Sequence, residues 1–158
     1  MFEAILAALV ARCIRFVLVS GVAATVHGSA RFTNDIDVCY DAAPDNVDRL
    51  VELLTGWNVY LRGIEPGLPF VLDQRTFRTT PLLTLTSTMG AIDLQDHVPG
   101  VGDYRDALAV AEWVRIGPTE FQVLTLEALI SSKHATRRKK DVEHLIELEA
   151  ILALRRQS

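Results

Sequence analysis

The sequence predicts a single α+β domain that spans residues 1–158. Two kinds of pattern support this fold class. Apolar residues recur at helical spacing in several segments, including 45–54 and 141–154. Short β-rich runs lie between the helical segments, and in residues 76–95 they follow one another closely enough to favour antiparallel pairing. A chain of 158 residues buries roughly two-thirds of its unfolded surface, so neither a disulfide nor a structural metal is required for stability.

The first half of the chain alternates predicted helices and strands. An opening amphipathic helix at 3–12 leads into a strand at 15–19. Ser20-Gly21 forms a tight turn into a short helix, which Gly28 ends. The elements expected next are a strand at 36–40, a helix from Asp45 to Gly56, a strand at 57–61 and an exposed loop at 63–69.

The second half contains more predicted strands. They cover residues 77–80, 82–86 and 91–94, and a hairpin joins 113–116 to 121–124. A loop at 97–102 and a short helix at 104–110 precede the hairpin. Thr125 caps the first helix of a C-terminal helical pair. The buried stripe expected for the last helix is Val142, Leu145, Ile146, Leu148 and Leu152, and Trp57 and Trp113 are expected in the core.

Composition and charge exclude several classes of protein. No apolar run approaches the ~20 residues of a membrane span, and the N-terminal segment lacks the basic region of a signal peptide. Cys13 and Cys39 lie in apolar surroundings without CxxC spacing, which is typical of reduced thiols in a cytoplasmic protein. A net charge of −4 argues against a globally basic nucleic-acid binder. Residues 133–140, with five basic side chains in eight positions, remain a local anion-binding candidate.

Two carboxylates one residue apart are the unusual feature of the chain. Asp35 and Asp37 flank Ile36 in a predicted strand, so both point to one face while Ile36 points into the core. Like charges on one face cost free energy unless a cation or a proton offsets them. Asp93 lies in a later apolar strand, and hard divalent cations prefer carboxylate oxygens, so the three aspartates are predicted metal ligands. Asp96 is close enough in sequence to serve in place of Asp93.

The Ser20-Gly21 turn lies between a predicted strand and a predicted helix. Free backbone N–H groups and the helix dipole favour phosphate at such a position. Small residues at strand-to-helix turns are also common for packing reasons alone. Arg31, in the following loop, is a further candidate for phosphate contact, with a solvated surface arginine as the alternative.

Residues 20–38, SGVAATVHGSARFTNDIDV, resemble the signature of nucleotidyltransferases with a DNA polymerase β-like core. That signature is a Gly-Gly or Gly-Ser turn, a short helix and Asp-x-Asp on the next strand. The later LEALISSKHATRRKKDVEHL extends the similarity to minimal nucleotidyltransferases of the AbiEii-like toxin and related prokaryotic groups. The resemblance covers about Phe16 to Leu152. The turn here is Ser-Gly, and the large helical domain with which many relatives select an acceptor is not expected.

The resemblance implies a mixed sheet flanked by helices and a defined reaction. A nucleoside monophosphate would move from a nucleoside triphosphate such as ATP to an acceptor hydroxyl, with release of pyrophosphate. By the family pattern Asp35 and Asp37 bind Mg²⁺ or Mn²⁺, and Asp93 is the third carboxylate, which helps to activate the acceptor. The residues expected to hold the triphosphate are Ser20, Gly21, Arg31, Lys133 and Lys140. Lys133 and Asp141 are also expected to take part in catalysis, Asp141 either as an orienting group or as the acceptor base.

The acceptors that the resemblance implies are tRNA or another RNA end and a protein hydroxyl, in a toxin–antitoxin system. Acceptor choice is expected to depend on a partner, such as an antitoxin, or on a second copy in a homo-oligomer. Two other functions stay open. One is a catalytically inactive module with the same fold that binds a nucleotide or an antitoxin partner, and the other is modification of a small molecule such as an aminoglycoside.

Overall fold

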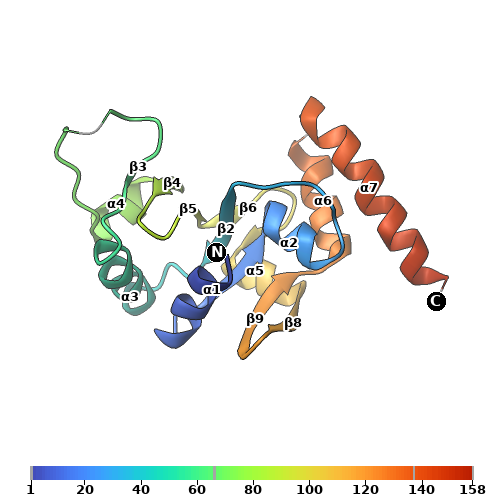
Figure 1. Cartoon of the computed structure of the whole chain (residues 1–158), viewed down its shortest axis with the longest axis horizontal. Coiled ribbons are helices and arrows are strands. Elements are labelled where there is room, and N and C mark those ends of the chain that lie inside the picture. Colours follow the sequence, from blue (N-terminus) through green and yellow to red (C-terminus); the bar gives the residue numbers. More distant parts are fainter. Residues whose placement is uncertain (1, 66, 137, 158) are drawn as a thin grey trace.

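The computed structural model describes residues 2–65, 67–136 and 138–157, and in these residues it contains a seven-stranded mixed sheet (Figure 1). Its strands are β1 (Phe16–Val19), β2 (Asp35–Tyr40), β3 (Tyr60–Leu61), β4 (Leu82–Thr86), β5 (Ala91–Gln95), β8 (Ala111–Ile116) and β9 (Thr119–Leu124). Their order across the sheet is β3-β4-β5-β2-β1-β9-β8. The β1–β9 and β2–β5 pairs are parallel, and the other neighbours are antiparallel. The predicted α+β class is confirmed.

Seven helices accompany this sheet in the described residues. They are α1 (Phe2–Ala11), α2 (Ser20–Val26), α3 (Pro44–Thr55), α4 (Gln74–Thr79), α5 (Tyr104–Ala109), α6 (Leu126–Thr136) and α7 (Lys139–Arg156). In Figure 1, α3 and α4 lie at one end of the molecule, and the C-terminal pair α6 and α7 lies at the other. Within the described part of the chain, no helix combines the length and the apolar character needed to span a bilayer.

The core lies around the central strands. All four residues of β1 are buried, because β2 and β9 pair with its two edges and other elements cover both faces. In β2, Ile36 and Val38 are fully buried, whereas Asp35 and Asp37 are only partly buried. The alternation predicted for this strand is therefore present, and it turns the two carboxylates away from the core.

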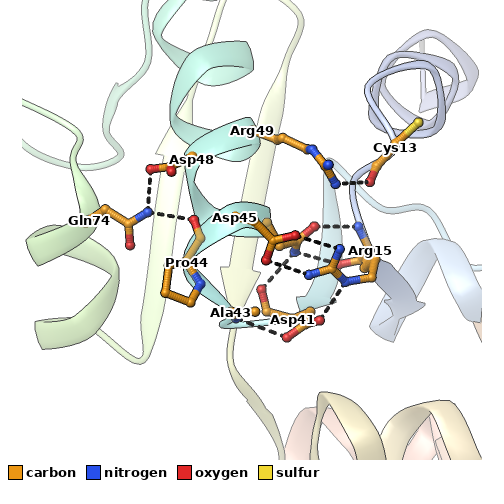
Figure 2. Close-up of polar contacts among 10 residues, drawn as sticks. Cys13, Arg15, Asp41, Ala43, Pro44, Asp45, Asp48, Arg49 and Gln74 are labelled. Carbon is orange, nitrogen blue, oxygen red and sulfur yellow. Dashed lines mark hydrogen bonds and ion pairs between the residues drawn. The ribbon is translucent and has the colours of Figure 1, made fainter.

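A polar junction joins the start of β1 to the start of α3. The Asn46 side chain is fully buried, accepts a hydrogen bond from the Arg15 backbone N–H at 2.7 Å and donates to the Asp41 carbonyl at 2.8 Å. The Arg15 guanidinium pairs with Asp41 at 2.7 Å and with Asp45 at 3.0 Å (Figure 2). Because Asp41 directly follows β2, the junction fixes the end of that strand opposite to Asp35.

One predicted strand, 77–80, is wrong, because residues 74–79 form α4. Asp73 starts this helix with a capping box: its carboxylate accepts from the Thr76 backbone N–H at 2.9 Å, and the Thr76 hydroxyl accepts from the Asp73 N–H at 3.3 Å. Phe77 then packs edge-on against Tyr40, with 5.3 Å between ring centroids. The β-like residue types in this segment are outweighed by the cap and by this contact.

Two other elements differ from their predicted extent. The strand expected at 57–61 shortens to β3, because residues 56–58 form a turn after α3. The segment 97–102, expected to be a loop, contains the short strand β6 (His97–Val98), which pairs with β7 (Gly102–Asp103). These two-residue strands are too short to show an alternating pattern in sequence.

Several apolar side chains expected to be buried are exposed. Trp113 is 67% exposed on the edge strand β8. Cys13, for which the sequence indicated apolar surroundings, is exposed two residues after the end of α1. In α7, Val142 and Ile146 are 55% and 65% exposed, whereas Leu148 is buried as predicted, together with Asp141 and His144. The stripe prediction was wrong for Val142 and Ile146, because α7 turns a charged residue, Asp141, toward α6.

Candidate active site

Three carboxylates converge where β2 and β5 lie side by side. The parallel register places Asp37 opposite Asp93, and Asp35 precedes Asp37 by two residues on the same face of β2. One carboxylate oxygen from each of the three residues lies within 4.8 Å of the others. Asp96 lines a different cavity beside Tyr40. The structure therefore brings together the three predicted metal ligands, with Asp93 rather than Asp96 as the third.

The protein environment penalises the negative charge of this cluster. Burial, a hydrogen bond with Asp93 and the charges of Asp35 and Asp93 raise the pKa of Asp37 to about 9. Burial and the neighbouring Asp93 also raise the pKa of Asp35. The site thus favours an added positive charge or a proton. Three oxygen donors at this spacing fit a hard divalent cation such as Mg²⁺, which would supply that charge.

Arg62 is a member of the site that the sequence patterns did not indicate. Its guanidinium forms an ion pair with Asp93 and donates to the Leu85 carbonyl at 2.9 Å. Arg62 directly follows β3, so its position depends on the pairing of β3 with β4 and of β4 with β5. The local sequence around Arg62 gives no sign that β3 pairs with β4 or that β4 pairs with β5.

The start of α2 supplies the small residues of the site. Ser20 and Gly21 are the first two residues of the helix rather than a separate turn, and Ser20 takes a positive φ of 61°. Val19, at the N-cap, makes no side-chain capping hydrogen bond in the described structure, as expected of an apolar residue. A Cβ on Gly21 would lie 2.8 Å from the Thr33 hydroxyl oxygen, so glycine permits the loop before β2 to pack on this turn.

That loop, residues 28–34, is anchored at both ends. The Glu147 carboxylate of α7 accepts a hydrogen bond from the Ser29 hydroxyl at 2.5 Å and from the Ala30 N–H at 3.1 Å. At the other end, the Thr33 hydroxyl donates to the Asp35 carbonyl at 3.2 Å. Arg31 and Phe32 lie between these anchors, and Phe32 is 82% exposed.

Buried His27 connects the loop to the body of the protein. Its Nε2 lies 2.7 Å from the Leu124 carbonyl at the end of β9. Arg155 of α7 donates to the His27 carbonyl at 3.1 Å. These contacts assign His27 a packing role and give α7 a second connection to the segment that carries Arg31.

Two basic side chains, Lys133 of α6 and Arg138 at the start of α7, form a basic wall around the Asp141 carboxylate. The Asp141 carboxylate accepts hydrogen bonds from the Lys133 ammonium at 3.0 Å, the Thr136 hydroxyl at 2.8 Å and the Arg138 guanidinium at 3.0 Å. Burial alone would raise the pKa of Asp141, but these hydrogen bonds and the charge of Lys133 outweigh it and lower the pKa to about 2. Asp141 is therefore an anion at neutral pH and fixes the positions of its three donors.

These groups share one cavity of about 330 Å³. Its lining includes eight predicted site residues: Ser20, Gly21, Arg31, Asp35, Asp37, Asp93, Lys133 and Asp141. The ninth, Lys140, has its backbone in α7, but its side chain lies outside the described part of the structure. An adjoining cavity of about 470 Å³ shares Ser20, Lys133 and Arg138 and has an aliphatic wall that includes Val98 and Leu129.

His144 also lines the first cavity and was not predicted as a site residue. It is 4% exposed, and its Nε2 has no hydrogen-bond partner among the described residues. Burial, together with the positive charges of Lys133 and Arg31, lowers the pKa of His144, so the ring is neutral near pH 7. The apolar-stripe prediction for α7 did not include His144, because such a prediction selects apolar residues alone.

The fold and the cavity define an α+β protein in which a carboxylate cluster faces a basic wall. Comparisons of the chain with models of known protein families and with curated proteins found no match. A functional assignment therefore depends on the geometry and chemistry of the cavity.

Proposed function

We propose that the protein is an Mg²⁺- or Mn²⁺-dependent nucleotidyltransferase that moves a nucleoside monophosphate from a nucleoside triphosphate to an acceptor hydroxyl. The observation that carries the proposal is the presence, in one cavity, of three convergent carboxylates and of the cationic side chains Arg31, Lys133 and Arg138. A carboxylate cluster attracts cations, and a basic wall attracts anions. A polyphosphate with its divalent cation satisfies both surfaces at once.

Asp35, Asp37 and Asp93 would hold the divalent cation. When bound, the cation supplies charge neutralisation and polarises phosphate oxygens. The raised pKa of Asp37 supports this role, because it indicates how poorly the metal-free cluster tolerates its own charge. The Arg62 guanidinium holds one oxygen of Asp93 and thereby orients the carboxylate.

The triphosphate would lie against α2 and the basic wall. The Ser20 hydroxyl and the first N–H groups of α2 are donors for phosphate oxygens, and Gly21 lets the phosphate approach the backbone closely. Lys133 and Arg138 add positive charge, and Asp141 keeps them in place. Arg31 lines the same cavity from the anchored loop.

In the proposed reaction, the acceptor oxygen forms a bond to the α-phosphorus while the bond between the α-phosphorus and the bridging oxygen to the β-phosphate breaks. Pyrophosphate leaves, and the acceptor hydroxyl gives up its proton. Asp93 is the better candidate to receive that proton, because Asp141 already accepts hydrogen bonds from three donors. Asp141 would act as an orienting group, one of the two roles the sequence left open.

The direct test is transfer of label from α-³²P nucleoside triphosphates to cellular RNA and protein with Mg²⁺ or Mn²⁺. We expect the wild type to transfer label and Asp37→Asn to lose at least 100-fold, the cost of about 2.7 kcal/mol of transition-state stabilisation. Asp96→Asn is the matched control, since Asp96 is a nearby carboxylate outside the cavity. Absence of transfer to any RNA or protein, or equal transfer by Asp37→Asn, would refute the proposal.

One observation favours a second candidate, an inert module that binds nucleotide. The Arg62 guanidinium already pairs with Asp93, as a permanent cation would in a protein that has no use for a metal. Calorimetry separates the two functions. A transferase needs Mg²⁺ for tight binding of the triphosphate, whereas an inert module with arginine as its cation binds equally well in a chelator. Association with an antitoxin or with a second copy is compatible with either function.

A further inference from the structure

An aromatic side chain that does not contribute to the core lies at the rim of the candidate active site. Phe32 is 82% exposed, and it lines the same cavity as Ser20 and the carboxylates. Exposed leucines and valines are common on protein surfaces. A phenylalanine with most of its ring in water, at the mouth of a cavity walled by charged groups, lacks the stabilisation that burial of such a side chain provides.

Phe32 is exposed although the loop that carries it is anchored on both sides. Two residues before it, Ala30 is held by Glu147, and one residue after it, Thr33 packs on Gly21 and bonds the Asp35 carbonyl. The backbone that presents the ring is thus fixed on both sides. A surface fixed in this way loses little conformational entropy when a ligand covers it.

The proposed ligand of the cavity restricts which chemical group can cover the Phe32 ring. If the proposed function is correct, the cavity holds a triphosphate whose nucleoside must extend from the α-phosphate toward the rim. Among the described residues that line the cavity, Phe32 carries the apolar aromatic ring, and the exposed Leu82 is the other large apolar side chain. The adjoining cavity offers aliphatic side chains such as Val98 and Leu129, which lack a π-face.

We propose that Phe32 is the stacking platform for the nucleobase of the bound nucleoside triphosphate. This inference rests on the proposed function and adds the position of the base to it. Every nucleobase has a π-face, so stacking on Phe32 gives affinity without selecting one base by hydrogen bonds. The protein should therefore bind ATP, GTP, CTP and UTP with similar affinities, with a modest advantage for the larger purines.

The test compares a nucleotide with a polyphosphate that carries no nucleoside. Calorimetry with Mg²⁺ measures the affinity of wild type, Phe32→Ala and Phe32→Tyr for α,β-methylene-ATP, which cannot be transferred, and for inorganic tripolyphosphate, which has no base. Phe32→Ala should weaken the nucleotide about 5- to 150-fold and leave tripolyphosphate unchanged. Phe32→Tyr should retain the affinity. Trp113→Ala removes another exposed aromatic side chain, one outside this cavity, and should change neither ligand.

The outcomes separate this inference from the function on which it rests. If wild type binds neither ligand, the proposed function fails and the inference fails with it. If wild type binds both and Phe32→Ala binds both equally well, the function stands and the stacking platform is refuted. An equal loss for the two ligands would also refute it, because Phe32 would then support the loop rather than the base. Melting temperatures of the variants confirm that each one is folded.

Discussion

Asp37 of β2 lies directly opposite Asp93 of β5, although the two residues are far apart in sequence. Parallel pairing requires a crossover between the two strands, and here α3, β3, α4 and β4 form that connection. The β4 strand returns antiparallel to β5, and the site is completed by Arg62, which follows β3. The carboxylate cluster is thus assembled by long-range pairing, and each carboxylate depends on the register of its neighbour.

The first prediction concerns the metal. Addition of Mg²⁺ or Mn²⁺ should raise the melting temperature of the wild type, because an ion that binds only the folded state stabilises it by about 2.7 kcal/mol at 100 times its dissociation constant. Asp37→Asn should be about as stable as wild type in a chelator at pH 7, because the raised pKa already keeps Asp37 protonated and uncharged there, and it should lose most of the metal response. Differential scanning calorimetry measures both effects. An unchanged metal response in Asp37→Asn would place the ion elsewhere.

Part of this site was predictable from sequence for a local reason. Strand alternation fixes the relative direction of Asp35 and Asp37, so their common face follows from two-residue spacing alone. The partnership of Asp37 with Asp93 depends on which strands pair and in which register, and single-sequence patterns do not carry that information. Arg62 was missed for the same reason.

The helices show a different limit of sequence patterns. Apolar periodicity placed Val142 and Ile146 in the core, yet both are exposed. The buried face of α7 is instead set by Asp141, whose three hydrogen bonds offset the free-energy cost of burying a carboxylate. A pattern that scores only apolar residues cannot identify a helix face organised around a satisfied charge.

The second prediction concerns Asp141. Asp141→Asn should lower the free energy of unfolding at pH 7 by about 2–4 kcal/mol, because it leaves the mostly buried Lys133 ammonium without its anion. Urea denaturation measures this change. The exposed neighbour Glu143 provides the control, and Glu143→Gln should fall within about 0.5 kcal/mol of wild type. A loss in Asp141→Asn no larger than in the control would contradict the role assigned to this ion pair.

The third prediction is the acid limit of the same interaction. The folded pKa of Asp141, about 2, lies below the unfolded value near 3.9. A lowered carboxyl pKa stabilises the protein above the unfolded pKa, and that contribution disappears as the pH falls from about 4 toward 2. The difference in unfolding free energy between wild type and Asp141→Asn should therefore shrink over this range. A difference that stays constant down to about pH 2.5 would show that titration of Asp141 is not its source.

The fourth prediction concerns the connection between α7 and the loop that carries Phe32. Glu147→Ala removes the acceptor for the Ser29 hydroxyl and the Ala30 N–H, and hydrogen bonds to a charged group contribute about 1.5–3 kcal/mol each. Because the loop is partly exposed, we expect a loss of about 1–2 kcal/mol in stability and a fall in nucleotide affinity as the rim becomes less ordered. Glu149→Ala, on the same helix but paired with exposed His134, should leave nucleotide affinity unchanged. Equal effects of the two variants would show that the loop connection does not control the rim.

The fifth prediction concerns the contact between Gly21 and Thr33. A Cβ at position 21 would lie 2.8 Å from the Thr33 hydroxyl oxygen and 3.1 Å from its Cβ, and a β-branched side chain has little rotamer freedom with which to yield. Gly21→Ala should therefore displace the loop before β2 and destabilise the protein by about 1–3 kcal/mol, which urea denaturation measures. It should also weaken binding of inorganic tripolyphosphate in calorimetry, since the added methyl group lies at the proposed phosphate surface.

The matched control for Gly21→Ala is Gly56→Ala at the end of α3. Gly56 has a negative φ of −64°, and the nearest neighbour of an added Cβ would be the Leu53 carbonyl oxygen at 3.4 Å, an ordinary contact distance. This substitution should be neutral or slightly stabilising, because it restricts the unfolded chain without a clash in the folded one. If Gly21→Ala matched this control in both stability and tripolyphosphate affinity, the packing of Thr33 on Gly21 would not be what holds the phosphate surface and the rim of the cavity together.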